Sequence, residues 1–376
     1  MNVVLFYGGK SGEHEISLIS CAAVAKEISS EHKVSLISVS KSGKWYLEED
    51  SVLEDLRSGK TSALEVHEKE ENAVSVFPGN GKDKSLFAKG AFIPCDAAFP
   101  VMHGTFSEDG TIQGLFEMCG IPFVGSGVLA SAVSMDKETA KILCSAAGIP
   151  VVPYVCLRRG VVNDSRAFDK AIEEAIQKLG LPIFVKPCAA GSSDGASLAQ
   201  NDRELFAAIG EAFSWDNKIL LEKAINAREV ECSVTGNSVT EDYLVSETLL
   251  KAYGPGEIVP RHEFYDYDAK YTDPNGADLK IPALLPEEKL CEIRTLAKKA
   301  YAALNESGLS RVDFFIDKND DSLYLNEVNT LPGFTGISMF PKMCASEGLD
   351  FTNLIDLLLK EAVTEFAQKN VLRTSR

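Results

Sequence analysis

The chain has 376 residues, of which 45% are hydrophobic and 25% are charged, and its formal net charge at pH 7 is -17. This composition excludes a disordered chain, and the length predicts two or three domains. Nucleic-acid affinity depends on clustered Lys and Arg, so we expect no nucleic-acid partner for so acidic a chain. The nine Cys show no C-x-x-C spacing, which argues against a disulfide framework or a zinc site.

The amino-terminal segment has a short apolar run without a preceding basic stretch or a small-residue cleavage site. It is therefore not expected to be a signal peptide. No apolar stretch approaches the roughly 18 residues that a membrane span needs. We expect a cytoplasmic protein that does not insert into membranes.

The first part of the chain alternates strands and helices. The pattern predicts a buried strand over 3–7, a helix over 15–28, a strand over 34–39, a strand ending at His103, a helix over 111–118 and a strand over 122–125. This order is typical of an α/β domain with a parallel sheet, which binds ligands beyond the carboxyl ends of its strands. Residues 41–91 are polar and weakly periodic, so we interpret them as a surface elaboration of this first domain, residues 1–127.

A second domain is predicted over residues 128–225. It begins with a helix over 128–147, which Gly148 ends. Further elements are then predicted in alternation: strands over 151–157, 183–187, 196–200 and 219–225, and helices over 165–179 and 202–213. The remaining residues, 226–376, form a third domain with strands over 229–236, 243–250, 310–317 and 322–330, and helices over 287–304 and 352–367.

Two motifs suggest other functions. Residues 125–130 match G-x-G-x-x-A, but no acidic residue follows at the distance that a dinucleotide-binding strand needs, so a tight turn is favoured. Residues 191–195 match the G-x-S-x-G elbow of hydrolases, with Ser193 as the nucleophile. An elbow turns from a strand into a helix, whereas this loop leads into a predicted strand, which disfavours a hydrolase.

A loop of small residues follows Lys186 at the end of a predicted strand. Gly191 and Gly195 permit unusual backbone angles, so the loop amides can lie over a triphosphate. Lys137 and Lys186 are candidates for neutralising phosphate oxygens. The alternative is a flexible hairpin with solvated lysines.

Two strands near the carboxyl end carry the strongest pattern. Alternation places Arg311 with Asp313 on one face of the first strand, and Glu327 with Asn329 on one face of the second. If the two faces coincide, their oxygen atoms form a set that suits Mg²⁺ or Mn²⁺ shared with phosphates. The alternative is a structural Arg311–Asp313 ion pair beside an edge-facing Glu327.

These segments resemble a known family. VKPCAAGSSDG, LLEKAI, SRVDFF and NEVNTLPG resemble the ATP-grasp fold, and EHEIS, FYDYDAKY and TLPGFTGIS resemble the D-alanine–D-alanine ligases within it. The resemblance runs through nearly the whole chain in order. It implies an α/β chain with an amino-terminal parallel domain and two mixed α+β domains that enclose ATP.

The resemblance also implies roles for individual residues. ATP would be bound by Lys137, Lys186, Ser193, Glu222, Lys223, Ala224, Ile225 and Glu229, and two Mg²⁺ or Mn²⁺ ions by Asp313, Glu327 and Asn329. The first D-alanine would lie at Glu13 and near His103, with Ser192 and Tyr271 tying the closing loop to Glu13. Arg311 and the Gly333 amide would stabilise the tetrahedral oxyanion, and Lys270 and Ser338 would bind the second carboxylate.

The expected reaction is ATP-dependent synthesis of D-alanyl-D-alanine for peptidoglycan, through an acyl phosphate, in a homodimer. The long loop around 264–271 would close as a lid. Two residues depart from the family pattern: Asp194 stands where an apolar residue is usual, and Ser107 replaces a frequent Gly. The alternatives are D-lactate or D-serine as second substrate, and a nucleotide-binding protein without catalysis, which only Asp194 favours.

Overall fold

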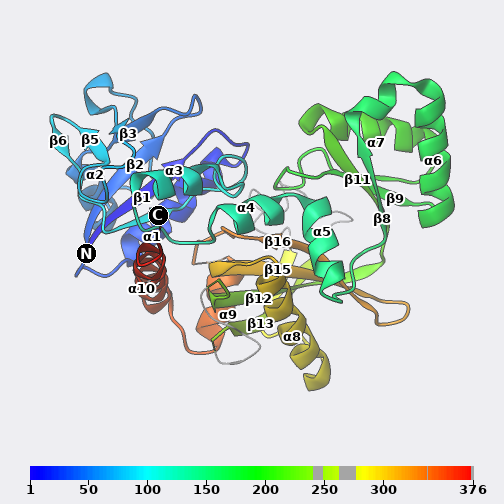
Figure 1. The fold of residues 1–376 in the computed structure, drawn as a ribbon. Helices are drawn as coiled ribbons and strands as arrows, with labels where there is room; N and C mark the ends of the chain where they lie inside the picture. Colours follow the sequence, from blue (N-terminus) through cyan, green and yellow to red (C-terminus); the bar gives the residue numbers. More distant parts are fainter. Residues whose placement is uncertain (240–248, 262–276, 337, 374–376) are drawn as a thin grey trace.

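The computed structural model describes residues 1–239, 249–261, 277–336 and 338–373 (Figure 1). The strands are Asn2–Gly8 (β1), Lys33–Val39 (β2), Trp45–Leu47 (β3), Ser75–Val76 (β4), Leu86–Ala88 (β5), Ala91–Phe92 (β6), Ala97–Pro100 (β7), Tyr154–Arg158 (β8), Ile183–Pro187 (β9), Ser197–Ala199 (β10), Lys218–Lys223 (β11), Ala227–Asn237 (β12), Lys251–Pro260 (β13), Ala277–Lys280 (β14), Ser307–Asp317 (β15) and Leu323–Asn329 (β16). The α-helices are His14–Glu27 (α1), Asp50–Arg57 (α2), Thr111–Cys119 (α3), Val128–Met135 (α4), Lys137–Ala146 (α5), Ser165–Leu179 (α6), Asp202–Trp215 (α7), Glu287–Ala303 (α8), Met339–Ser346 (α9) and Phe351–Asn370 (α10).

The amino-terminal sheet has the strand order β3-β2-β1-β7. β1 pairs in parallel with both β2 and β7, which confirms the predicted parallel α/β arrangement. Nearly all of β1 is apolar and buried, as expected for a strand covered on both faces. The loop after β1 therefore lies at the carboxyl edge of the sheet, where the sequence predicts a binding site.

The polar region over 41–91 contains more structure than its sequence indicates. β3 joins the edge of the main sheet, and β4, β5 and β6 form a small sheet of their own. Each of these strands has only two or three residues. Such short strands leave almost no alternation in the sequence, which explains why the pattern predicts none.

The single helix predicted over 128–147 is wrong. The helix is interrupted at Asp136, which lies between α4 and α5 with an extended backbone. The Asp136 side chain accepts a hydrogen bond from the Thr139 amide. Asp at an N-cap competes with helix continuation because its oxygen binds the free amides of the following turn. A new helix therefore starts at Lys137.

The predicted strand over 122–125 is also wrong, because only an isolated bridge joins Phe123 to Ala98. Gly125, just after it, has a positive φ of 104° and packs against Gly308. A Cβ on Gly308 would lie 3.1 Å from the Gly125 backbone. The G-x-G-x-x-A motif thus supplies a tight turn and a close backbone contact.

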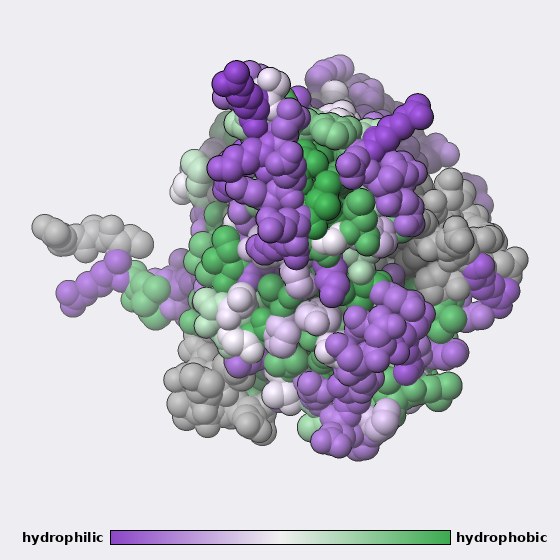
Figure 2. Space-filling view, turned by 90° about the vertical axis from the view of Figure 1, so that its right-hand side faces the viewer, coloured by the Kyte–Doolittle hydropathy of each residue, from purple (hydrophilic) through white to green (hydrophobic). Residues whose placement is uncertain are grey.

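The middle region contains an antiparallel sheet with the order β10-β9-β11-β8. α6 and α7 pack against it through apolar residues such as Ile172, Leu205 and Ile209. Figure 2, seen from the right-hand side of Figure 1, shows a mostly hydrophilic face with hydrophobic side chains in narrower patches between.

The third sheet has the order β14-β13-β12-β15-β16 and is also antiparallel. It positions the two strands that carry the predicted metal site. The sequence did not indicate β13, because Gly254, Pro255 and Gly256 interrupt it, and such residues rarely occur inside a strand. The strand predicted over 243–250 and the lid predicted around 264–271 fall on or across residues outside the described ranges.

The last helix returns to the amino-terminal sheet (Figure 1). Leu354 and Leu358 of α10 belong to the same buried hydrophobic cluster as Leu5 and Phe99. The two ends of the chain therefore share one core. The division into domains at 127 and 225 stays a prediction.

None of the helices in the described ranges has the length and apolar character that crossing a membrane requires.

Candidate active site

The paired strands β15 and β16 bring the predicted acidic residues together. Arg311 lies opposite Asn329, and Asp313 lies opposite Glu327. Because residues directly opposite each other share a face of the sheet, the four side chains occupy one face. The faces of the two strands therefore coincide, which was the condition for the predicted set of oxygen ligands.

Asp313 is held by two neighbours. Arg311 donates from Nε to Oδ1 at 2.8 Å and from Nη2 to Oδ2 at 2.7 Å, and Asn329 Nδ2 donates to Oδ2 at 3.0 Å. Arg311 also lies 3.1 Å from Glu231 of β12. Burial lowers the pKa of Arg311, but the charges of Asp313 and Glu231 outweigh it and raise the pKa well above its usual value. The ion pair of the structural alternative therefore exists, within the larger group.

A β-bulge connects this group to the middle region. The register of β15 and β16 shifts directly after the Asp313–Glu327 pair, so Asn326 has no partner on β15. A bulge turns the extra side chain away from the regular alternation. The Asn326 side chain accepts a hydrogen bond from Lys186 Nζ of β9 at 3.1 Å. The bulge thus links the acidic strand to a predicted phosphate-binding lysine.

Lys137 approaches the same site from the start of α5. Its Nζ donates to the Ala190 carbonyl at 2.8 Å and lies 3.5 Å from Glu327 Oε2. Lys137 therefore joins the loop after β9 to the acidic strand. Both lysines that the sequence predicts for phosphate binding lie beside Glu327 or its neighbour Asn326.

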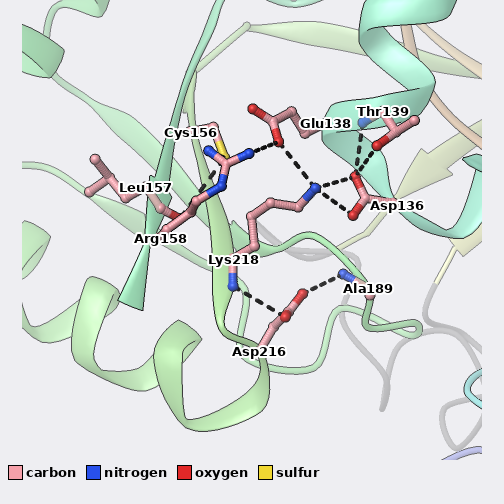
Figure 3. Close-up of polar contacts among 9 residues, drawn as sticks. All are labelled: Asp136, Glu138, Thr139, Cys156, Leu157, Arg158, Ala189, Asp216 and Lys218. Atoms are coloured by element: carbon pink, nitrogen blue, oxygen red, sulfur yellow. Dashed lines mark hydrogen bonds and ion pairs between the residues drawn. The ribbon is translucent and has the colours of Figure 1, made fainter. Parts of the chain in front are cut away.

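A second set of charges fixes the start of α5 and the base of the loop (Figure 3). Lys218 Nζ lies 2.5 Å from Asp136 Oδ2 and 3.1 Å from Glu138 Oε2. Asp216 accepts a hydrogen bond from the Ala189 amide at 2.8 Å. These contacts attach both α5 and the loop to the start of β11, so Lys137 and the loop are held by the same strand.

Glu13 meets the loop after β9 from the amino-terminal region. Ser192 Oγ donates a short hydrogen bond to Glu13 Oε1. Two glycines make room for the carboxylate, because a Cβ would lie 2.5 Å from Glu13 Oε2 on Gly191 and 2.6 Å on Gly104. The Glu13–Ser192 pair predicted by resemblance is therefore in contact.

Asp194 lies in this loop beside the amino-terminal segment. A Cβ on Gly12 would lie 3.0 Å from Asp194 Oδ2. Burial, together with the charge of Glu13, raises the pKa of Asp194. The carboxylate does not prevent the loop from lying against Glu13.

The far end of the loop packs on an aromatic ring. A Cβ on Gly195 would lie 2.5 Å from Cδ1 of Trp215, at the end of α7. The Trp215 indole donates from Nε1 to Glu211 at 3.0 Å, while the residue is 51% exposed. Only a glycine leaves space for the indole at this place.

His103 has both ring nitrogens engaged by protein atoms. Nδ1 lies 2.9 Å from the Leu331 carbonyl, and Nε2 lies 2.9 Å from Ser20 Oγ. Burial lowers the pKa of His103 despite the opposing charge of Glu13. A neutral ring that donates to Leu331 and accepts from Ser20 fits these contacts. His103 thus connects α1 to the loop that carries Gly333.

Gly333 and Ser338 lie together after β16. A Cβ on Gly333 would lie 3.3 Å from Ser338 Oγ, which also accepts a hydrogen bond from the Thr335 amide at 3.1 Å. The two predicted residues thus share one turn.

Glu222 contacts two lysines. Its two carboxylate oxygens lie 2.8 Å from Lys141 Nζ and 2.7 Å from Lys186 Nζ, so they face lysines. Lys223 is the last residue of β11, Ala224 and Ile225 lie in the connection between β11 and β12, and Glu229 lies on β12. Ser193 has a positive φ of 65° in the loop after β9. The predicted residues Lys270 and Tyr271 lie outside the described residues.

Four residues of the site have no place in the sequence prediction. Lys141 follows Lys137 by four positions, which puts both on one face of a helix, and Glu231 follows Glu229 at strand spacing. These periodicities were signals that could have been used. The place of Asn326 in the site depends on the bulge, and so it could not be predicted from periodicity. Glu108 accepts a hydrogen bond from the Gly104 amide at 3.2 Å, and its place depends on the fold of the loop.

The donor set fits a hard divalent cation. Asp313, Glu327 and Asn329 offer carboxylate and amide oxygens from one face of one strand pair, the ligand type that Mg²⁺ and Mn²⁺ prefer. No group of three or more His, Cys, Asp or Glu side chains suited to a metal occurs among the described residues.

The hydrolase elbow lacks its geometry. Residues 191–195 connect β9 to β10, which pair in antiparallel fashion, and no helix follows the loop directly. A nucleophile elbow requires the turn from strand to helix. The arrangement instead suits a loop over phosphates, flanked by Lys137 and Lys186.

Comparisons with known proteins find similar proteins over nearly the whole chain. Residues 2–126 match the family model described as D-ala D-ala ligase N-terminus, and residues 143–360 match the one described as D-ala D-ala ligase C-terminus. A D-alanine–D-alanine ligase of Treponema denticola is 50% identical over 376 residues, which covers 100% of both chains.

Solved structures show the same fold. The D-alanine–D-alanine ligase from Coxiella burnetii has a TM-score of 0.81 and 30% identity, covering 99% of this chain and 96% of that one. The VanG D-Ala:D-Ser ligase from Enterococcus faecalis has a TM-score of 0.79 and 35% identity, covering 96% and 100%. The fold is therefore the ATP-grasp fold predicted from the sequence.

Proposed function

The chain belongs to the D-alanine–D-alanine ligase family, and from this premise we propose that it joins two D-alanine molecules to D-alanyl-D-alanine for peptidoglycan synthesis, consuming ATP. The observation that carries the proposal is the shared face of β15 and β16, where Arg311, Asp313, Glu327 and Asn329 meet. Lys137 and Lys186 approach it from the middle region.

The reaction has two steps. An oxygen of the first D-alanine carboxylate attacks the γ-phosphate of ATP, which forms D-alanyl phosphate and releases ADP. The amine of the second D-alanine, after losing a proton, attacks the carbonyl carbon, and inorganic phosphate leaves. Glu13 binds the first ammonium, and Ser192, bonded to Glu13, holds the loop over the substrates together with Tyr271.

ATP is bound between the middle and carboxyl-terminal regions. Lys137 and Lys186 neutralise its phosphates, with Ser193 in the covering loop. Lys223 at the end of β11, with Ala224 and Ile225 in the connection after it, holds the adenine beside Glu222, and Glu229 holds the ribose. Because the Glu222 carboxylate faces two lysines, its main effect is to position Lys186.

Two Mg²⁺ or Mn²⁺ ions are held by Asp313, Glu327 and Asn329. The ions supply positive charge that offsets the negative charge of the transferring phosphate. Arg311 and the Gly333 amide stabilise the oxyanion that develops on the carbonyl. Ser338, next to Gly333, binds the second carboxylate with Lys270, and His103 orients the Gly333 loop through the Leu331 carbonyl.

The setting of the enzyme is proposed on the same basis. D-alanine and ATP are its small-molecule partners, and we propose that it acts in the cytoplasm as a homodimer. Light scattering coupled to gel filtration tests the homodimer: a mass near 40.7 kDa, that of one chain, would contradict it.

The test of the function is ADP release with and without D-alanine, with the Glu327→Gln variant alongside. We expect D-alanine-dependent turnover, and a loss of about 100-fold or more in the variant, because a ligand to the phosphate-bound ions is removed. ATP turnover that ignores D-alanine would contradict the ligase. Near-normal turnover in Glu327→Gln would contradict the metal site.

D-serine as the second substrate is the alternative to test, because the E. faecalis relative is a D-Ala:D-Ser ligase. The Lys270–Tyr271 pair favours D-alanine over D-lactate by resemblance. Product analysis with D-alanine, D-serine and D-lactate in competition at neutral pH should give mainly D-alanyl-D-alanine. A mixed product as the main species would assign the alternative.

A further inference from the structure

A buried group of charges lies behind the phosphate-binding lysine. Lys141 of α5, Glu222 of β11 and Lys186 of β9 form a chain, with Nζ–O distances of 2.8 and 2.7 Å to the shared carboxylate. Their side chains are only 1%, 3% and 9% exposed. Two cations therefore share one anion out of contact with bulk solvent.

Such a buried charged group is not expected to stabilise the fold more than apolar residues would. Taking charged groups out of water costs several kcal/mol each, and well-packed apolar residues are often equally stable in their place. Burial lowers the pKa of Lys141, while Glu222 opposes this change. Burial also lowers the pKa of Lys186, but the charges of Glu222 and Glu327 outweigh it, so this pKa is raised overall.

Lys141 also has a fixed place in the site. It lies one helical turn after Lys137, on the same face of α5, and its Nζ is 3.4 Å from the Leu325 carbonyl of β16. Leu325 directly precedes Asn326, which binds Lys186. Lys141 therefore touches the strand that carries Glu327 and the carboxylate that orients Lys186.

Without Lys141, Glu222 would be balanced by Lys186 alone. The Lys186 ammonium would then be paired with the Glu222 carboxylate and drawn toward it. With Lys141 present, this group of three side chains carries one net positive charge beside the negative Glu327. Lys186 is then not paired with Glu222 alone.

We infer that Lys141 is a positioning residue for nucleotide phosphates: it shares the Glu222 carboxylate with Lys186, so that Lys186 is not held by Glu222 alone and stays oriented toward the substrate. The inference rests on the proposed function for the identity of the ligand. It predicts an effect on phosphate recognition, with adenosine recognition unchanged.

The test is calorimetric titration of the full chain with ADP and Mg²⁺, and separately with adenosine. We expect Lys141→Met to weaken ADP binding about tenfold, the loss of one well-placed charge contact, and to leave adenosine binding within about twofold. Lys170→Met on α6 is the matched control, since Lys170 is 76% exposed and should change neither. Unchanged ADP binding in Lys141→Met, or an equal loss for both ligands, would overturn the inference.

A double variant keeps the test decisive if Lys141→Met does not fold. The double variant Lys141→Met with Glu222→Gln removes the Glu222 carboxylate together with the Lys141 cation that balances it, so no buried carboxylate has lost its partner. If Lys141 acts through Glu222, this double variant should bind ADP as Glu222→Gln alone does. A difference of more than about threefold between them would overturn the inference. Failure of the ligase assay with intact ADP binding would instead concern the proposed function.

Discussion

At the scale of single residues, Asp194 is the departure from the family pattern with the clearest setting. It lies beside Gly12 in the loop that Ser192 attaches to Glu13. Its carboxylate therefore sits close to the proposed ammonium site and in the loop proposed to cover phosphates. The same charge should attract one substrate and repel the other.

We expect Asp194→Asn to raise the KM for the first D-alanine and lower the KM for ATP, each by about two- to fivefold, as for a partly exposed charge. Because burial and the charge of Glu13 raise the Asp194 pKa, this carboxylate takes up its proton at a higher pH than a free Asp, and the two proteins should converge as pH falls through that pKa. Steady-state kinetics across pH measures both effects. Parallel changes in the two KM values would speak against this role.

The residues of the proposed metal site show what sequence can predict at this scale. Strand alternation placed Arg311 with Asp313, and Glu327 with Asn329, and the register joined the two faces. Strand alternation in the sequence could not reveal the contact of Lys186 with Asn326, because a bulge is a one-residue shift that leaves no periodic signal. Nor could it show that Glu222 faces two lysines, since that depends on packing between α5 and β11.

At the scale of elements, the junction before β15 carries a buried acid. Glu306 is fully buried, its Oε1 accepts a hydrogen bond from Ser134 of α4 at 2.8 Å, and its Oε2 has no hydrogen-bond partner among the described residues. Burial raises the pKa of Glu306 to about 8, although Ser310 and Ser134 oppose this. The acid is therefore protonated at neutral pH in the folded protein.

This junction should make stability depend on pH. In the unfolded chain Glu306 ionises near its ordinary value of 4.5, whereas in the fold it keeps its proton until about pH 8. The protonated acid thus contributes stability that is complete below about pH 4.5 and is lost as pH rises to about 8. We expect Glu306→Gln to reduce the loss of unfolding free energy between pH 6 and 9 by on the order of 2 kcal/mol.

Urea unfolding at several pH values measures the effect. Glu173→Gln, a change on the exposed face of α6, is the control and should follow the wild type. The same slope in wild type and Glu306→Gln would show that Glu306 is ionised in the fold.

The break between α4 and α5 shows why a helix boundary could not be predicted from local sequence. Residues 128–147 are good helix formers, so propensity favours one helix. Asp136 ends it because its side chain caps the next helix and also binds Lys218. The second helix has its own direction, which brings Lys137 to the loop after β9. Tertiary contacts decided this boundary, and they are not visible in local sequence.

At the scale of the whole molecule, the last helix packs against the first sheet. Leu354, Ile355, Leu358 and Leu359 of α10 are fully buried in the cluster that contains Val3, Leu5 and Tyr7 of β1. The predicted division of the chain by sequence order cannot express this return, because a contact between the two ends leaves no local pattern. The fold class itself was predictable, since it follows from the order of elements and the motifs.

Leu358→Ala should therefore destabilise the amino-terminal core by about 2–5 kcal/mol, through lost apolar burial and the cavity that remains. Leu372→Ala, which changes a residue 67% exposed just beyond α10, should have almost no effect. Urea denaturation followed by circular dichroism compares the two. A loss below about 0.5 kcal/mol in Leu358→Ala would show that α10 is an appendage.

The contact of Trp215 with Gly195 gives the protein an optical reporter. The chain contains two Trp, and one of them rests on the loop proposed to cover the phosphates. Movement of the loop away from the indole changes the polarity around the ring and hence its emission. In a Trp45→Phe background, stopped-flow fluorescence would then follow loop closure during nucleotide binding in real time, without a dye or an engineered label.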